Sequence, residues 1–187
     1  TGTTAIGCYS HDNTKSGFLV STAALINCVA ANNSGAASDG ITCANGTPMI
    51  YGCVSYNNGR TGLNFTGSNF CACINSIFVS NAVYGINTQL SATGNPIMQN
   101  YNFNAFYNNT SGARNKLGVG PNDVTLTGVP FTNAAGADYS LNNTTGQGAA
   151  CRSVGSPGTS PFGTGYNDIG ALRHQDPTGG GYNITFD

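Results

Sequence analysis

The chain has 187 residues, only seven per cent of them charged, with six Lys and Arg against seven acidic residues and a formal net charge of −1. Soluble domains usually carry about 25% charged residues, so this composition argues against salt-bridged helices. The basic residues are scattered, which argues against a nucleic-acid partner, and the apolar runs are too short to predict insertion into a membrane.

The length fits a single domain. The sequence begins Thr1-Gly2-Thr3, with no initiator Met and no charged segment leading into an apolar stretch. We therefore expect either a processed mature chain or a fragment of a longer one, and favour an exported protein with an extracellular, cell-surface or virion-surface location.

A repeat of about 20 to 30 residues occupies the first part of the chain. Its copies begin near residues 6, 26, 51, 71 and 102, and each is followed by a short run after a Gly. Alternate small or apolar residues in each copy predict a strand, Asn-Asn predicts a turn, and the run after Gly predicts a second strand. A short repeat without helical periodicity predicts an all-β fold, a right-handed parallel β-helix of about five coils.

Stacking places like residues above like at about 4.8 Å, so a column of identical charges would repel itself. This explains the scarcity of charge. Two columns of the structural ladder are predicted by aligning the copies: Asn13, Asn33, Asn58, Asn81 and Asn109, and Cys8, Cys28, Cys53 and Cys73. We favour an internal role for the asparagines, as a side-chain hydrogen-bond ladder, over a binding role.

The repeat fades at about residue 113. We assign 1–112 to the coils and 113–187 to the last coil and an irregular C-terminal cap of the same domain, with short strands near 124–127, 129–131, 138–141 and 168–172. No equivalent cap precedes the first copy. We expect the strand edge there to be covered either by preceding sequence or by another chain, and the second case favours self-association through the ends of the β-helix, including end-to-end filaments.

The repeat, typified by Asn-Cys-Val-Ala-Ala-Asn-Asn at 27–33, and the tail motifs at 130–131, 138–141 and 168–171 resemble the right-handed parallel β-helix superfamily of pectate-lyase-like and other secreted repeat proteins. The resemblance covers most of the chain. The resemblance implies the fold, but it does not specify an activity, because the superfamily includes lyases, hydrolases, adhesins and phage tailspikes.

One charged group is a candidate for catalysis. Aligning the copies brings Lys15, Arg60 and Asp39 together, near His11 and Asp12. Glycoside hydrolysis needs two carboxylates, and lyase chemistry needs an acidic cluster with a base. There is no Glu in the chain. We therefore favour a surface ion pair, and keep Asp12, Asp39, Lys15 and Arg60 as the active-site alternative.

Three tyrosines, Tyr9, Tyr56 and Tyr107, are candidates for stacking on sugar rings, with packing against neighbouring aromatics as the alternative. The seven cysteines lack the spacing of a zinc site, so no metal and no cofactor are predicted. Adjacent coils would permit disulfides, but buried free thiols are favoured because the number is odd.

Together these features predict a non-catalytic structural β-helix module, self-assembling or glycan-binding. The alternative is a polysaccharide lyase or glycoside hydrolase of the pectate-lyase-like class.

Overall fold

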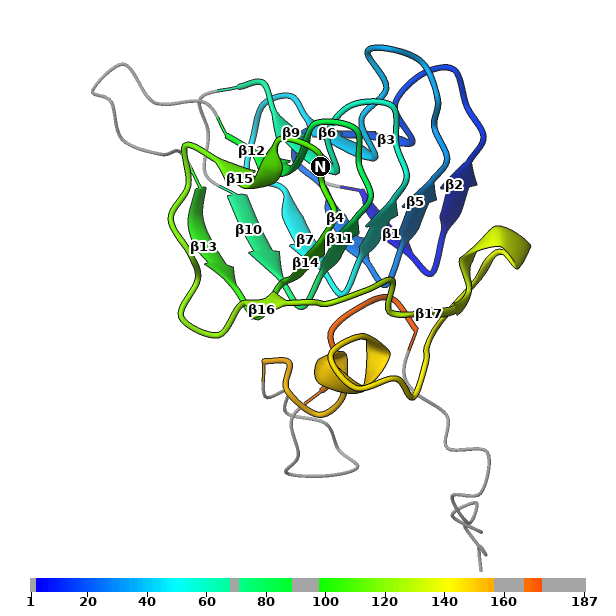
Figure 1. The fold of residues 1–187 in the computed structure, drawn as a ribbon. Coiled ribbons are helices and arrows are strands. Elements are labelled where there is room, and N and C mark those ends of the chain that lie inside the picture. The colour runs from blue at the N-terminus through cyan, green and yellow to red at the C-terminus, as the bar shows by residue number, and fades with distance from the viewer. Residues whose placement is uncertain (1–2, 68–70, 89–97, 157–166, 173–187) are drawn as a thin grey trace, which may run out of the picture.

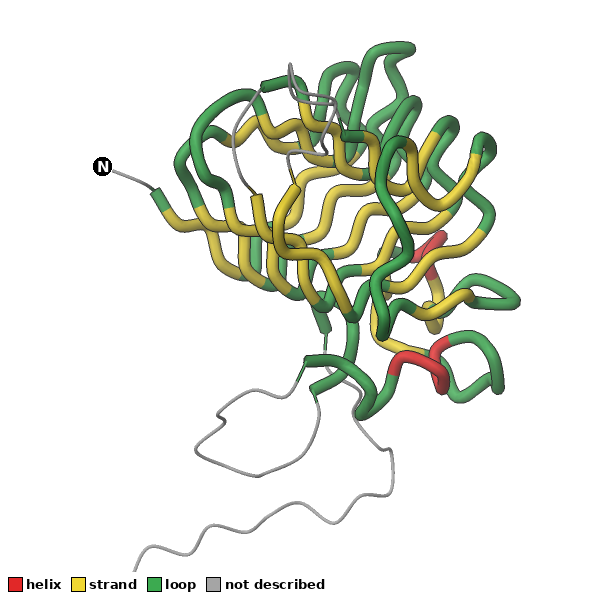
Figure 2. The backbone as a smooth tube through the Cα atoms, turned by 90° about the vertical axis from the view of Figure 1, so that its left-hand side faces the viewer, coloured by secondary structure: helices red, strands yellow, loops and turns green. Residues whose placement is uncertain are grey.

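The computed structural model describes residues 3–67, 71–88, 98–156 and 167–172. Its strands stack in parallel as a β-solenoid of five coils, and each coil contributes one strand to each of three sheets (Figures 1 and 2). Only two short 3-10 helices, η1 (Ala134–Gly136) and η2 (Gly148–Cys151), occur in the described part. The prediction of an all-β solenoid of about five coils is confirmed.

The first sheet contains β1 (Thr4–Ile6), β4 (Ala24–Ile26), β7 (Met49–Tyr51), β10 (Cys71–Ile74) and β13 (Met98–Asn102). The second contains β2 (Tyr9–His11), β5 (Val29–Ala31), β8 (Val54–Tyr56), β11 (Ile77–Val79), β14 (Ala105–Tyr107) and β16 (Val124–Thr125). The third contains β3 (Phe18–Val20), β6 (Ile41–Cys43), β9 (Leu63–Phe65), β12 (Tyr84–Asn87) and β15 (Gly112–Asn115).

Each first strand expected from the alternation is in fact two strands that meet at a corner. In the first coil β1 ends at Ile6 and β2 begins at Tyr9, so two residues turn the chain from one sheet into the next. The first corner residue has a left-handed backbone in every coil, with φ between 52° and 62°: Gly7, Asn27, Gly52, Asn75 and Phe103. Gly and Asn tolerate this conformation best, and period-two alternation cannot reveal it.

The corner also sets the register, and it corrects the predicted place of Cys73. Strand pairing puts Cys73 level with Ile50 and Tyr101 in the first sheet. The second corner residue of the fourth coil is Ser76, whose hydroxyl accepts a hydrogen bond from the Cys53 N–H at 3.1 Å. The column beside the corner is therefore Cys8, Cys28, Cys53, Ser76 and Asn104. The prediction was wrong because it aligned the fourth copy on a cysteine instead of on the Asn that turns the corner.

The interior of the solenoid is filled by inward-facing side chains from all three sheets. The buried cluster is Val20, Leu25, Cys28, Ala30, Ile41, Cys43, Ile50, Cys53, Leu63, Phe65, Cys71, Cys73, Phe78, Ile86 and Phe106. All seven cysteines are free thiols, and only Cys8 is exposed. Burial raises the pKa of Cys151 to about 12, and also raises that of Cys73. These thiols therefore pack as small apolar side chains.

The C-terminal segment has two parts with different positions. Residues 116–126 lie across the end of the last coil: Leu117 packs on the interior, and Val124 pairs with Ala105. The described residues after 126 lie along the outer face of the second sheet, including the hairpin of β17 (Phe131–Asn133) and β18 (Asp138–Leu141) (Figure 1). It covers a second apolar cluster built on Val29, Val54, Ile77, Val79 and Ala105. The expected strand at 168–172 is a bend instead.

Candidate functional site

The predicted asparagine ladder is present at the turn that follows the second sheet. Each side-chain amide donates to the Oδ1 of the next coil's asparagine, at 2.8 to 2.9 Å, along Asn13, Asn33, Asn58, Asn81 and Asn109. The same Oδ1 atoms accept backbone N–H groups, as Asn58 Oδ1 does from Asn33 N at 3.2 Å. From Asn33 onward the members are buried. The ladder satisfies backbone groups of the turn, and its buried members use their side-chain amides for bonds within the fold.

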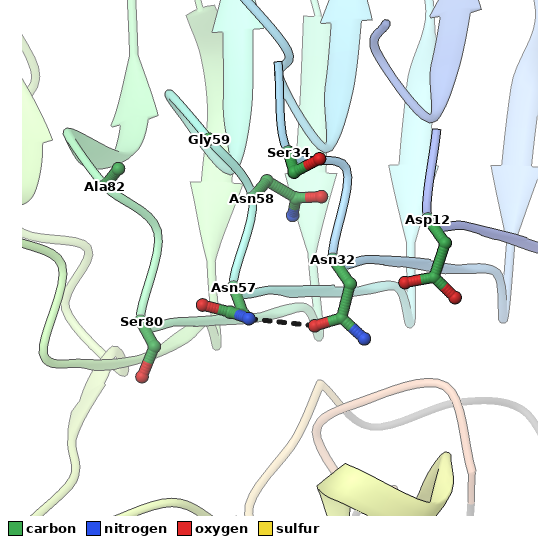
Figure 3. A pocket seen from close by; sticks show the side chains of 8 residues that line it. All are labelled: Asp12, Asn32, Ser34, Asn57, Asn58, Gly59, Ser80 and Ala82. Carbon is green, nitrogen blue, oxygen red and sulfur yellow. Dashed lines mark hydrogen bonds between the residues drawn. The ribbon is translucent and has the colours of Figure 1, made fainter. Parts of the chain in front are cut away.

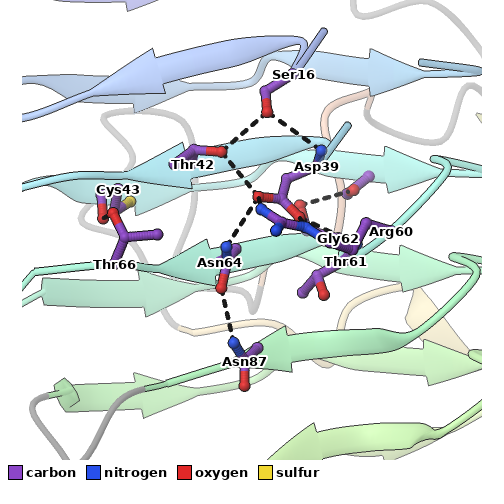
Figure 4. Close-up of polar contacts among 11 residues, drawn as sticks. Ser16, Asp39, Thr42, Cys43, Arg60, Thr61, Gly62, Asn64, Thr66 and Asn87 are labelled. Atoms are coloured by element: carbon purple, nitrogen blue, oxygen red, sulfur yellow. Dashed lines mark hydrogen bonds and ion pairs between the residues drawn. The ribbon is translucent and has the colours of Figure 1, made fainter. Parts of the chain in front are cut away.

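The predicted charged group separates into two unconnected parts. In the first part, Asp39 precedes β6 and is fully buried, and Arg60 of the next coil forms an ion pair with it (Figure 4). Arg60 Nε donates to Asp39 Oδ1 at 2.7 Å, and a second guanidinium nitrogen donates to Oδ2. The carboxylate raises the pKa of Arg60 through this hydrogen bond. This pairing is bidentate and holds consecutive coils together.

Three further donors saturate the Asp39 carboxylate. Thr61 N donates to Oδ1 at 3.2 Å, and Thr42 Oγ1 and Asn64 Nδ2 donate to Oδ2 at 3.0 and 2.9 Å. A carboxylate offers about four lone-pair positions, so five donors leave none for a substrate proton. Asp39 therefore stabilises the turn, and its position does not suit a general acid or general base.

A second amide ladder, which the sequence reasoning missed, leads to this carboxylate along the outer face of the third sheet. Asn115 Nδ2 donates to Asn87 Oδ1 at 2.8 Å. Figure 4 shows the continuation, in which Asn87 donates to Asn64 at 2.7 Å and Asn64 donates to Asp39. Every amide points the same way, and the chain ends on a negative charge. The signal in the sequence was an Asn that recurs in the third strand of successive coils.

The other predicted residues lie at a different turn. Asp12 Oδ2 contacts His11 Nδ1 at 2.6 Å, and both side chains are about half exposed or more. Lys15 is exposed and has no ion-pair partner among the described residues. No contact in the described part joins Asp12 or Lys15 to the Asp39 pair. The structure thus shows a His–Asp contact and a separate Arg–Asp ion pair in place of one four-residue site. The expectation of a surface ion pair is wrong for Asp39, because its side chain is fully buried beneath Arg60 and the neighbouring donors.

Asp12 begins a column of left-handed residues that lines a shallow groove of about 450 Å³. Figure 3 shows the side chains of Asp12, Asn32, Asn57 and Ser80 projecting from this edge, with Asn57 Nδ2 donating to Asn32 Oδ1 at 2.9 Å. Ser34 and Gly59 also line it. Asp12 is the one charged residue of the lining.

The candidate sugar-stacking tyrosines all lie on the second sheet. Tyr9 donates to the Tyr139 hydroxyl at 3.1 Å and keeps 41% of its surface exposed. Tyr56 packs edge-on against Phe131 and Tyr139, with ring centroids 5.7 and 5.8 Å apart. Tyr107 is also packed against the cluster beneath the C-terminal segment. Packing against that segment and the apolar cluster beneath it therefore accounts for the position of these rings.

A buried ion pair at the C-terminal end of the solenoid was not anticipated. Arg114 lies level with the inward-facing Ile86, stacks 4.1 Å from the centroid of Phe106, and pairs with Asp123. The side chains of Arg114 and Asp123 are 11% and 2% exposed. Asp123 also accepts from Asn104 N at 2.8 Å and Gly120 N at 2.9 Å. This ion pair covers the apolar interior at the C-terminal end of the solenoid.

The described residues contain no cluster of three or more side chains suited to a metal ion. Within the same ranges, no helix is long and apolar enough to span a membrane. Comparison of the chain with family models, curated proteins and solved structures found no match.

Proposed function

We propose that this chain is a non-catalytic structural module of a cell or virion surface, a rigid β-solenoid whose polar side chains are used to hold its own coils together. The carrying observation is that every carboxylate in the described ranges has a partner within the fold. His11, Arg60 and Arg114 pair with Asp12, Asp39 and Asp123, while Asp138 accepts from Ser140 and Asp168 from Ser153 N. Glycoside hydrolysis generally needs two carboxylates that reach the substrate, and the described lining of the groove contains only Asp12.

The alternative, a polysaccharide lyase or hydrolase, makes a distinct prediction. Incubated with a panel of acidic and neutral polysaccharides, the native chain should release no reducing ends or unsaturated products above a buffer control. If the native chain releases product and Asp39→Asn does not, the enzymatic function would replace this proposal. The Asp12→Asn variant should lose release as well; because Asp12 is exposed, that loss would not be explained by misfolding. If the protein is retained on immobilised polysaccharide and releases no product from it, a binding role for the groove beside Asp12 would be supported.

Self-association is a second proposed role, supported by the strand edges of the first coil. In the described structure β1, β2 and β3 each pair on one side only, and Ile6 and Leu19 are 64% and 72% exposed. At the opposite end the strands β13, β15 and β16 also pair on one side only, but the core is covered there by Leu117 and by the Arg114 and Asp123 pair. Two first-coil edges can pair around a two-fold axis, which fits these ends better than a head-to-tail filament does.

We expect the native chain to form a concentration-dependent dimer in sedimentation experiments. Ala5 faces the interior, so Ala5→Lys should place a charge between the paired coils and weaken dimerisation by more than about a hundredfold, since burying an unpaired ammonium costs several kcal/mol. Leu19→Lys changes an outward position of the same edge and is the matched control, which should still dimerise. A monodisperse monomer at high concentration would remove this role, and filaments by electron microscopy would favour head-to-tail stacking.

A further inference from the structure

The dipeptide Asn-Gly occurs twice in the chain, at Asn45-Gly46 and Asn58-Gly59. In this dipeptide the glycine backbone nitrogen can attack the side-chain carbonyl carbon of the asparagine, because no side chain at the glycine hinders the approach. The reaction needs a free backbone nitrogen and a side-chain amide that can rotate. The two copies differ in both respects.

Asn58 is held as a member of the buried ladder and is 2% exposed. Its Nδ2 donates to Asn81 Oδ1, Ser55 Oγ and Ala30 O at 2.9, 3.0 and 3.2 Å. The attacking atom is also engaged, because Gly59 N donates to Asn33 O at 2.7 Å. Reaction at Asn58 therefore requires the turn to open and several hydrogen bonds to break.

Asn45 lies in the loop between β6 and β7, where it and Thr47 are exposed. Its side chain and the Gly46 N–H form no hydrogen bond with any described residue. Gly46 has a left-handed φ of 88°. No hydrogen bond to a described residue therefore holds the Asn45 amide or the Gly46 N–H, although both residues pack closely on neighbouring coils.

We propose that Asn45 is a site of spontaneous deamidation in the folded protein and that Asn58 is protected. The Gly46 nitrogen forms a bond to Asn45 Cγ, the side-chain nitrogen leaves as ammonia, and a cyclic succinimide results. Water then adds to one of the two ring carbonyls and opens the ring. Opening gives aspartate when the original backbone is restored, and isoaspartate when the backbone passes through the side chain.

Both products change the surface in a defined way. The formal net charge moves from −1 to a value one unit more negative, a large relative change for so weakly charged a chain. Isoaspartate also adds a methylene to the backbone of a loop that packs closely on the preceding coil. A Cβ at Gly46 would lie 2.3 Å from Thr22 Oγ1, so there is little space for this extra length.

The test is incubation of the folded chain in mildly alkaline buffer at body temperature, followed by peptide mapping with mass spectrometry and isoaspartate detection. We expect aspartate and isoaspartate to accumulate at position 45, and conversion at position 58 to be slower by at least about a hundredfold, which needs an opening free energy of only about 2.8 kcal/mol. Asn45→Gln should abolish the new acidic species on ion exchange. Asn45→Asp marks where that species elutes.

A parallel incubation in concentrated urea separates sequence from structure. There the two Asn-Gly sites should react at similar rates, because the ladder no longer exists. Equal rates in the folded chain would overturn the protection of Asn58. An Asn45 that reacts in urea and stays intact in the folded chain would overturn the proposed site.

Discussion

Replacing Asn58 by Ala should lower the free energy of unfolding by about 3 kcal/mol or more, because each buried polar group left without a partner costs about 1–3 kcal/mol. The substitution removes the acceptor used by Asn33 N and Asn33 Nδ2, at 3.2 and 2.8 Å. It also removes the amide that donates to Asn81 Oδ1 at 2.9 Å. Both neighbours are 0% exposed, so water cannot replace the lost bonds without opening the turn.

The neighbouring asparagine provides a matched control. Asn57 has a left-handed φ of 52° and makes an exposed side-chain bond to Asn32. Asn57→Gly keeps that backbone conformation available and should change stability by about 0.5 kcal/mol or less. Urea denaturation followed by far-UV circular dichroism measures both variants. If Asn58→Ala cost no more than Asn57→Gly, the ladder would have no important part in holding the coils together.

Asp123→Asn should destabilise the protein by about 3–5 kcal/mol, because it leaves the Arg114 charge in a mostly buried position without its counter-ion. The Arg114 side chain is 11% exposed and lies over the Phe106 ring, so it can regain little hydration without leaving the core. An Asn side chain still offers one oxygen as acceptor to Asn104 N or Gly120 N. The substitution therefore removes mainly the negative charge and keeps part of the hydrogen bonding. Urea denaturation again gives the size of the loss.

The double variant Arg114→Met and Asp123→Asn distinguishes loss of charge balance from loss of shape. With the unpaired guanidinium removed, most of the stability lost in Asp123→Asn should return, as seen when buried ion pairs are replaced by apolar side chains. Hydrogen exchange should place the effect of the single variant in the last coil and in residues 116–126. A single variant as stable as the parent would show that the pair does not close the core.

The repeat was strong enough to predict the solenoid, its number of coils and the first asparagine ladder. Asn58 and its partners could be aligned because each copy carries Asn-Asn, or one Asn, just before the same turn. The same alignment failed for Cys73, since insertions shift the fourth copy and only the left-handed Asn75 marks the corner. A local pattern identifies a repeated position only when a residue with a specific backbone requirement anchors it.

The candidate site could be predicted less well. Asp39 and Arg60 were correctly brought together, because they occupy related positions in adjacent coils. That Thr42 and Asn64 would also bind Asp39, and that Asp12 and Lys15 would lie apart from it, depended on which side of each strand and turn the side chains occupy. Alignment by residue number carries no such information.

By itself the sequence determined a weakly charged, stacked β-solenoid, because stacking forces each coil to repeat the chemistry of the one below, and that repetition is visible in one dimension. Only the tertiary structure decided where the C-terminal segment lies and how the few charges are used. Tyr139 reaches back to Tyr9, 130 residues earlier, and Arg114 finds Asp123 across the end of the core. Each of these contacts occurs only once, so the sequence repeat cannot reveal it. They form because the second sheet has an apolar outer face and because the last coil has an open end that must be covered.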